Sequence, residues 1–138
     1  DYRWDKCDIK MTSLLGNVMA NEFAVQQNCF ETLFVRNGVI TEASHCNVFF
    51  IKEGVVNTHP ANEFILNGIT RQIVIDLCNQ LKIKVVEKGV VFSDIESRFN
   101  RNFYSNCLYK QLNNHTFYQG NKIGAVTKKL QQAYLELK

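Results

Sequence analysis

The sequence predicts an α+β domain, because two β-hairpin patterns lie in its middle and segments with helical periodicity lie on either side. Its 138 residues are the length of one domain, and a hydrophobic share of 46% is enough for a core. No linker rich in glycine, serine or proline divides the chain, and no repeat is visible. We therefore expect a single domain over residues 1–138 with a mostly antiparallel sheet.

The first expected element is a helix over residues 12–27. Its apolar residues recur at near-helical spacing: Leu15, Val18, Met19 and Phe23. This helix directly follows Lys10, so we expect Lys10 at a junction between a strand and a helix.

Two hairpins are expected next. Residues 29–36 and 39–42 are rich in β-forming residues and flank Asn37-Gly38, which is a strong hairpin signal. Residues 47–52 and 55–58 repeat this pattern around Glu53-Gly54. The middle of the chain is therefore expected to be an antiparallel sheet.

The second half of the chain predicts further helices and one strand. Apolar spacing predicts a helix from Ile69 to Leu81, with Thr70 as a candidate cap, and residues 82–88 predict a strand. Ser93 and Glu96 have the spacing of a capping box, which indicates the start of a short helix. A last helix is expected from Ile123, with one apolar face: Val126, Leu130, Ala133, Tyr134 and Leu137.

Composition argues against several classes of function. The net charge of +3 comes without a basic run, so we expect no nucleic-acid partner. No stretch approaches the roughly 18 to 20 apolar residues that cross a bilayer, so no membrane segment is expected. The first six residues are too charged for a signal peptide, which favours a cytoplasmic protein. The five cysteines form no CxxC pair, and free thiols in a reducing compartment are the simplest explanation. His45, His59 and His115 lie too far apart in sequence to predict a metal site.

Three features could carry chemistry, and each also has an ordinary structural explanation. Lys10 is one of eleven lysines, but apolar Ile9 and Met11 flank it, and an amine in a partly apolar pocket gains nucleophilicity. Glu42, at the end of a hairpin strand, would by default be a carboxylate at the rim of the sheet. Residues 68–70 would by default be a turn and cap, although the free amides at a helix start also form an anion site.

Several short motifs occur in order between Arg3 and Phe92. They are Arg3-Trp4, Cys7-Asp8-Ile9-Lys10, Leu14-Leu15-Gly16-Asn17-Val18, Gly38-Val39-Ile40-Thr41-Glu42-Ala43-Ser44, Asn47-Val48-Phe49, Thr58-His59-Pro60 and Ile65-Leu66-Asn67-Gly68-Ile69-Thr70-Arg71. Together they resemble the D-amino-acid aminotransferases of the class-IV pyridoxal-phosphate family, and residues 117–130 resemble that family's last strand and helix. The resemblance implies the carboxy-terminal, cofactor-binding domain of that fold, a mostly antiparallel sheet or pseudo-barrel with flanking helices.

The resemblance implies that Lys10 is the lysine that forms the Schiff base with pyridoxal 5'-phosphate and then moves a proton at the substrate α-carbon. It also implies that Glu42 faces the pyridine nitrogen and keeps it protonated, so that the ring can accept electrons.

Five further residues are assigned to the cofactor site by the same resemblance. The amides of Ile69 and Thr70, which follow Gly68, match the family's phosphate cup, and this agrees with the anion site expected from the residues alone. Leu66 matches the apolar residue that packs against the cofactor ring. Ser44 matches a position near the cofactor and its hydrogen-bond network.

The implied reaction is a transamination that converts D-alanine and 2-oxoglutarate to pyruvate and D-glutamate, in an enzyme that is a homodimer in its full-length form. Branched-chain aminotransferases and aminodeoxychorismate lyases share the fold and are alternatives within the family. An alternative from a different class is a non-catalytic remnant or interaction domain that has kept the fold and lost the chemistry.

The sequence departs from the family pattern in two respects. Family members carry an amino-terminal domain of about a hundred residues before the lysine, and it is absent here, so we expect weak or no cofactor binding by the chain alone. Residues 98–112 also depart from the pattern, and the match returns near Asn113. Such an abrupt loss and recovery suggests a local reading-frame slip or a degenerating gene, and we expect the sheet to lose a well-formed strand there.

Overall fold

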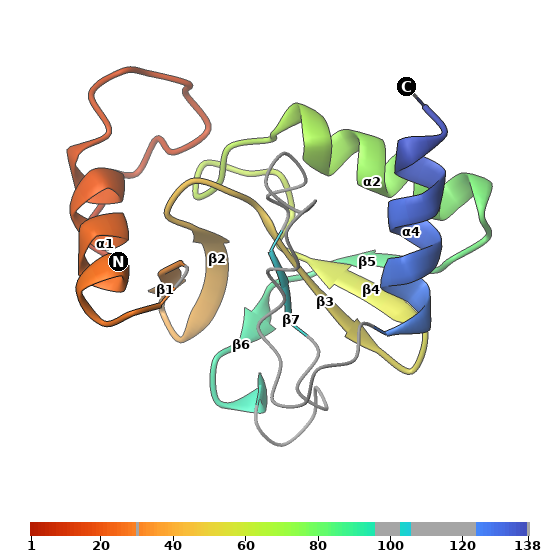
Figure 1. Ribbon diagram of the computed structural model, residues 1–138. Helices are drawn as coiled ribbons and strands as arrows, with labels where there is room; N and C mark the ends of the chain where they lie inside the picture. Colours follow the sequence, from red (N-terminus) through yellow and green to blue (C-terminus); the bar gives the residue numbers. More distant parts are fainter. Residues whose placement is uncertain (30, 96–102, 106–123, 138) are drawn as a thin grey trace.

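Two sheets and three helices form the part of the chain that the computed structural model describes, residues 1–29, 31–95, 103–105 and 124–137. A three-stranded sheet has the order β1-β2-β6, and a four-stranded sheet has the order β5-β4-β3-β7. Helix α1 lies beside the first sheet, whereas α2 and α4 lie together against the second (Figure 1). The predicted α+β class is confirmed, and the described strands do not close into a barrel.

Helix α1 spans Leu15–Gln26, three residues later than its periodicity predicted. The amide of Val18 bonds to the carbonyl of Leu14, which starts the helix there. Residues 1–14 contain no strand, so Lys10 lies in a loop rather than at a strand-to-helix junction. The buried residues of α1 are Ala20 and Ala24, and its large apolar side chains point outward.

Both predicted hairpins are confirmed. The first pairs β1 (Leu33–Arg36) with β2 (Val39–Ala43), and the second pairs β3 (Val48–Lys52) with β4 (Val55–Thr58). Both turns have two central residues with positive φ, 51° and 77° at Asn37 and Gly38 and 50° and 78° at Glu53 and Gly54. Such turns match the right-handed twist of paired strands, which is why these dipeptides favour hairpins.

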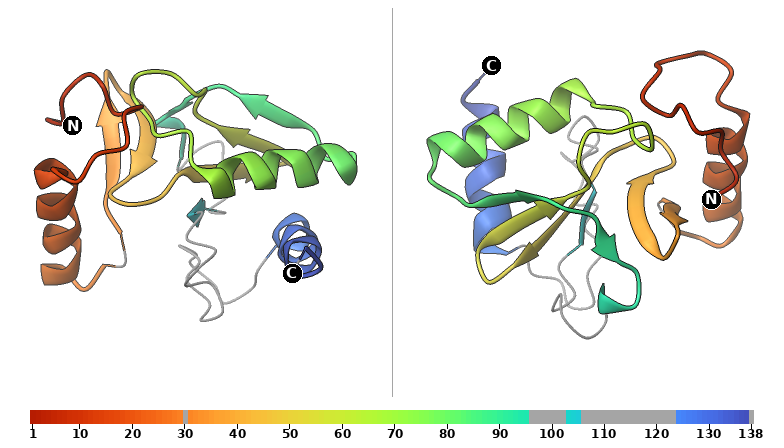
Figure 2. Two further views of the ribbon diagram at one scale, coloured as in Figure 1. Left: turned by 90° about the horizontal axis from the view of Figure 1, so that it is seen from above. Right: turned by 180° about the vertical axis from the view of Figure 1, so that it is seen from behind.

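Strand β3 is buried on both of its faces, which accounts for its unbroken apolar run. Val48 and Phe50 pack in a cluster with Ile40 and Val90 from the other sheet. On the opposite face, Phe49 packs with residues of β4, α2 and α4: Val56, Val74, Cys78, Val126 and Leu130. The sheet thus separates two small cores, and α2 and α4 cover the second (Figure 2).

Strands β4 and β5 (Val85–Glu87) are parallel, and α2 (Ile69–Gln80) is the crossover between them. The predicted helix is confirmed, but its cap is Gly68 rather than Thr70, which lies in the first turn. Gly68 has extended backbone angles, as a residue before a helix requires. The loop after β4 therefore places the start of α2 at one end of the sheet.

The last elements complete both sheets. Strand β6 (Val90–Val91) pairs with β2. Asp94 and Ile95 after it are helical, as the capping-box spacing predicted, whereas Glu96 lies outside the described residues. Strand β7 (Phe103–Ser105) pairs with β3, so the backbone retains a short strand inside segment 98–112, whose other residues lie outside the description. The predicted closing helix is α4 (Ala125–Leu135). The described helices are all too short or too polar to cross a membrane.

Candidate active site

A pocket of about 400 Å³ opens where the loop before α1, the end of β2 and the start of α2 meet. All seven residues assigned from the sequence line it: Lys10, Glu42, Ser44, Leu66, Gly68, Ile69 and Thr70. They come from three segments that are far apart in the chain. The fold therefore brings together every predicted site residue, and their individual environments differ.

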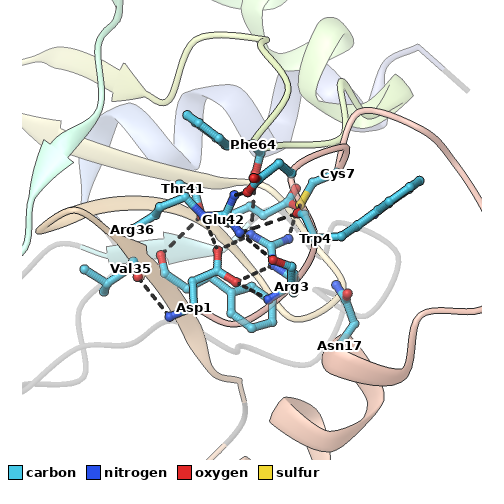
Figure 3. Close-up of polar contacts among 12 residues, drawn as sticks. Asp1, Arg3, Trp4, Cys7, Asn17, Val35, Arg36, Thr41, Glu42 and Phe64 are labelled. Carbon is cyan, nitrogen blue, oxygen red and sulfur yellow. Dashed lines mark hydrogen bonds and ion pairs between the residues drawn. The ribbon is translucent and has the colours of Figure 1, made fainter.

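Glu42 lies on the last part of β2 with only 6% of its surface exposed. The guanidinium of Arg3 donates to its Oε1 atom at 2.5 Å, and a second nitrogen of Arg3 bonds to Asp1 at 2.9 Å (Figure 3). Arg3 also lies over the ring of Phe34, 3.8 Å from its centroid. The pocket thus contains a buried carboxylate whose charge a buried guanidinium balances.

The other oxygen of Glu42 connects the carboxylate to the loop before α2. Its Oε2 atom accepts from the backbone amide of Leu66 at 3.1 Å and from the side-chain amide of Asn47 at 3.3 Å. Burial raises the pKa of Glu42, and the bonds from Arg3 and the Leu66 amide oppose that rise. A carboxyl group with this balance can hold or share a proton with a bound base.

Helix α2 begins at the pocket without a side-chain cap and without an acidic residue in its first turn. Its first amides therefore lack the anionic partner that a helix start favours. Behind this turn, the buried Arg71 donates to the side chain of Asn67, the carbonyl of His59 and the carboxylate of Glu87. These bonds fix the turn from the side away from the pocket.

Lys10 lies on the pocket wall and is solvent-exposed. Cys7 is one of two cysteines that also line the pocket, and its thiol donates to the carbonyl of Trp4. Burial raises the pKa of Cys7, so its thiol stays protonated and is a poor nucleophile at neutral pH.

Ser44 has a different environment from the one expected beside a cofactor. Only 2% of Ser44 is exposed, and its hydroxyl donates to the buried carboxylate of Glu31 and lies 3.0 Å from Nδ1 of His45. Glu31 also accepts from the amides of Thr32 and Ser44 and pairs with His45 at 2.7 Å. The Ser44 side chain therefore belongs to a network centred on Glu31, which does not itself line the pocket.

Arg3, Asn17 and Asn47 are pocket residues that received no role from the sequence. Arg3 and Asn47 bind Glu42, and the side chain of Asn17 donates to the carbonyl of Ser44 at 2.7 Å. All three lie within the ordered motifs that carried the family resemblance. Their place in these motifs was the only sign in the sequence that they belong to the site. A motif alone does not show which groups are in contact.

Several solved structures share the fold of this chain. The chain superimposes with a TM-score of 0.79 and 21% identity on a putative 4-amino-4-deoxychorismate lyase from Legionella pneumophila, covering 100% of this chain and 54% of that one. It superimposes equally well, with a TM-score of 0.79 and 21% identity, on a branched-chain aminotransferase from Thermobaculum terrenum in its PLP form, covering 96% and 45%. These likenesses establish the fold of the chain as that of a fold-IV aminotransferase.

The sequence defines the family. Residues 1–110 match the family profile described as "Amino-transferase class IV". The chain therefore belongs to this family of pyridoxal-phosphate-dependent enzymes. A D-alanine aminotransferase from Staphylococcus epidermidis is 53% identical over 74 residues, which are 54% of this chain and 26% of that protein. The chain thus spans about a quarter of the length of this relative.

The chemistry of the pocket fits the cofactor of this family. An amine (Lys10), a buried carboxylate (Glu42) and the uncapped start of α2 line one cavity. Pyridoxal phosphate presents an aldehyde, a basic ring nitrogen and a phosphate, which are the chemical complements of these three groups. A volume of about 400 Å³ is within the range of small-molecule sites.

Proposed function

We propose that this chain is the cofactor-binding part of a D-amino-acid aminotransferase that transfers the amino group of D-alanine to 2-oxoglutarate, giving pyruvate and D-glutamate. The observation that carries the proposal is the convergence of Lys10, Glu42 and the start of α2 on one pocket. Bound pyridoxal phosphate would supply the electron-withdrawing ring that stabilises negative charge at the substrate α-carbon.

Each pocket residue has a distinct task in this proposal. Lys10 Nζ attaches the cofactor and later carries a proton to and from the substrate. The Glu42 carboxylate, held by Arg3, keeps a proton at the ring nitrogen. The amides of Ile69 and Thr70, after Gly68, bind the phosphate, and the partly buried Leu66 packs against the ring. Ser44 acts indirectly, because its hydroxyl bonds to Glu31 and steadies the wall after β2.

The preference for a D-amino acid rests on sequence similarity. Identity to the Staphylococcus epidermidis D-alanine aminotransferase is 53% over 54% of this chain, whereas identity is 21% to the Legionella lyase and to the Thermobaculum branched-chain enzyme over 100% and 96% of it. The last two activities remain the alternatives within the family.

We also propose that the isolated chain is an incomplete enzyme. Its pocket is open enough to leave Lys10 exposed, and the chain spans only 26% of its D-alanine aminotransferase relative. Groups that bind the substrate carboxylate would then come from outside these 138 residues, either from an amino-terminal domain or from a second subunit of a homodimer. A purified chain with the turnover of a full-length relative would contradict this. A non-catalytic remnant would show no selective cofactor attachment at all.

The deciding experiment is selective capture of the cofactor at Lys10. The chain is titrated with pyridoxal phosphate, reduced with borohydride and mapped by mass spectrometry. We expect binding to be weak but selective, with Lys10 labelled at lower concentrations than the exposed Lys6, which does not line the pocket. We also expect Lys10→Ala to lose the visible absorbance band.

Two controls make this measurement specific. Lys6→Ala should leave the band and the Lys10 label unchanged, because it removes a nearby lysine outside the pocket. Pyridoxal without its phosphate should lose the selectivity for Lys10, because it cannot use the amides of α2. Equal labelling of Lys6 and Lys10 at every concentration would reject the proposed site.

A further inference from the structure

Asn47 lies between the two halves of the candidate site and contacts both. It is 8% exposed and directly precedes β3. Its side-chain nitrogen donates to the carbonyl of Leu66 at 2.8 Å and to Oε2 of Glu42 at 3.3 Å. The same Oε2 atom accepts from the amide of Leu66. Glu42, Asn47 and Leu66 therefore form a closed hydrogen-bonded ring that occupies both backbone polar groups of Leu66.

The environment of Gly68 also depends on Asn47. A Cβ atom added at Gly68 would lie 2.6 Å from Oδ1 of Asn47, closer than real contacts allow. The backbone angles of Gly68, φ −63° and ψ 145°, are ordinary for any residue, so conformation does not require glycine there. The absence of a side chain at residue 68 instead makes room for the amide of Asn47.

We propose that Asn47 is a positioning residue that holds the carboxylate of Glu42 and the turn formed by residues 66–68 in one fixed arrangement. The inference rests on the proposed function, because its consequence is that the Glu42 carboxylate and the first amides of α2 can bind the same cofactor molecule at once. Asn47 touches neither reacting atoms nor, in this role, the cofactor itself.

The chemistry of an asparagine suits this task. Its NH₂ group has two hydrogens, one for the Leu66 carbonyl and one for the Glu42 carboxylate. Aspartate has the same shape but would place a second negative charge beside Glu42 and lack a donor for Leu66. The ring is thus specific for a short side chain that donates twice.

The first test uses the chain without cofactor, so that it does not depend on cofactor binding. In Asn47→Ala we expect amide hydrogen exchange at Leu66 to accelerate about fivefold or more, as loss of a hydrogen-bonding arrangement implies. We expect the NMR titration midpoint of the Glu42 carboxyl carbon to rise, because the Leu66 amide is no longer held on the carboxylate.

Asn57→Ala is the matched control. The side chain of Asn57 also donates two hydrogen bonds, in its case to the backbone carbonyls of Phe50 and Val55, but it lies on β4 and does not line the pocket. A general loss of stability would move both variants alike. Only Asn47→Ala should change Glu42 and Leu66.

A double-mutant cycle tests the contact from the other side. Gly68→Ala should displace the Asn47 side chain and give the same changes at Leu66 and Glu42, whereas adding Gly68→Ala to Asn47→Ala should have little further effect. If Asn47→Ala does not fold, Gly68→Ala gives the same readouts by itself. A folded Asn47→Ala or Gly68→Ala variant with unchanged Leu66 exchange and Glu42 titration would overturn the proposal.

Cofactor capture separates this inference from the proposed function. If wild-type chain is not labelled selectively at Lys10, the proposed function fails, yet the exchange and titration results still decide the role of Asn47. If wild type is labelled, Asn47→Ala should need a higher concentration of pyridoxal phosphate for half-labelling of Lys10, and Asn57→Ala should not. Equal half-labelling concentrations for wild type and Asn47→Ala would reject the inference alone.

Discussion

Arg3 and Glu42 form an ion pair whose side chains are only 4% and 8% exposed. Burying two charges costs several kcal/mol per ion, and their attraction offsets this only if further hydrogen bonds satisfy the remaining polar atoms. Here Arg3 also bonds to Asp1 and Thr41, and Glu42 also accepts from Leu66. The pair is therefore well satisfied, and removing one member leaves the other as an uncompensated buried charge.

Arg3→Met should accordingly destabilise the chain by about 3 to 5 kcal/mol at neutral pH, in urea unfolding. Burial already raises the pKa of Glu42, and loss of Arg3 should raise it further. A raised folded-state pKa favours the folded state below the unfolded pKa, near 4.5, and this contribution is lost as pH rises through the folded pKa. The cost of Arg3→Met should therefore shrink toward acid pH. It should also be smaller in a Glu42→Gln background, and an equal cost in both backgrounds would show that the pair is not coupled.

At the scale of single residues, the sequence was informative about membership of the site and uninformative about contacts. Ordered motifs assigned Lys10, Glu42, Leu66 and residues 68–70 to a common family site, and in the structure all of them line one pocket. The contact of Arg3 with Glu42 joins residues 39 positions apart, and that of Asn47 with Leu66 joins residues 19 apart. Such pairings depend on how the sheet and loops fold together, and no local pattern encodes them.

Among the elements, those fixed by local backbone preferences were the most predictable. Asn37-Gly38 and Glu53-Gly54 each predicted a hairpin turn, and both hairpins formed in the expected place, with positive φ at the turn residues. The start of α1 was less predictable, because apolar spacing does not show where a loop ends. Thr70 was a reasonable cap by residue type, yet the approach of Asn47 to Gly68 is a tertiary contact that the spacing could not reveal.

The turn between β1 and β2 allows a direct test of backbone preference. A Cβ atom at Gly38 would meet nothing within 4 Å, so any penalty for a side chain there comes from its φ of +77°. Gly38→Ala should therefore cost about 1 to 2 kcal/mol of unfolding free energy, measured by denaturant titration. Gly38→Asn should cost clearly less, because asparagine tolerates the left-handed region. Equal costs for the two variants would mean that some contact, rather than backbone conformation, requires glycine.

For the whole molecule, the orientation of α1 was the feature that the sequence described least well. Its periodicity predicted the helix correctly, but a periodic apolar face would ordinarily be buried. In the described chain the face toward the first sheet carries Ala20 and Ala24, whose small side chains let the helix approach closely. The opposite face carries exposed side chains: Leu15 at 71%, Val18 at 63%, Met19 at 53% and Phe23 at 61%. Which face a helix buries depends on its neighbours in space.

This exposed α1 face, made of Leu15, Val18, Met19 and Phe23, should bind an apolar dye. Contiguous exposed apolar groups of this kind are uncommon on monomeric proteins, and they are the sites at which environment-sensitive dyes become fluorescent. We expect the folded chain to enhance the fluorescence of anilinonaphthalene sulfonate, and the double variant Val18→Ser/Phe23→Ser to lose most of that enhancement.

Both side chains are more than half exposed, so stability should change by only about 0.5 kcal/mol per site. Leu137→Ser, which removes a similarly exposed side chain (58%) beyond α4, is the matched control and should leave the signal unchanged. Retained dye fluorescence in the double variant would place the apolar surface elsewhere than on α1.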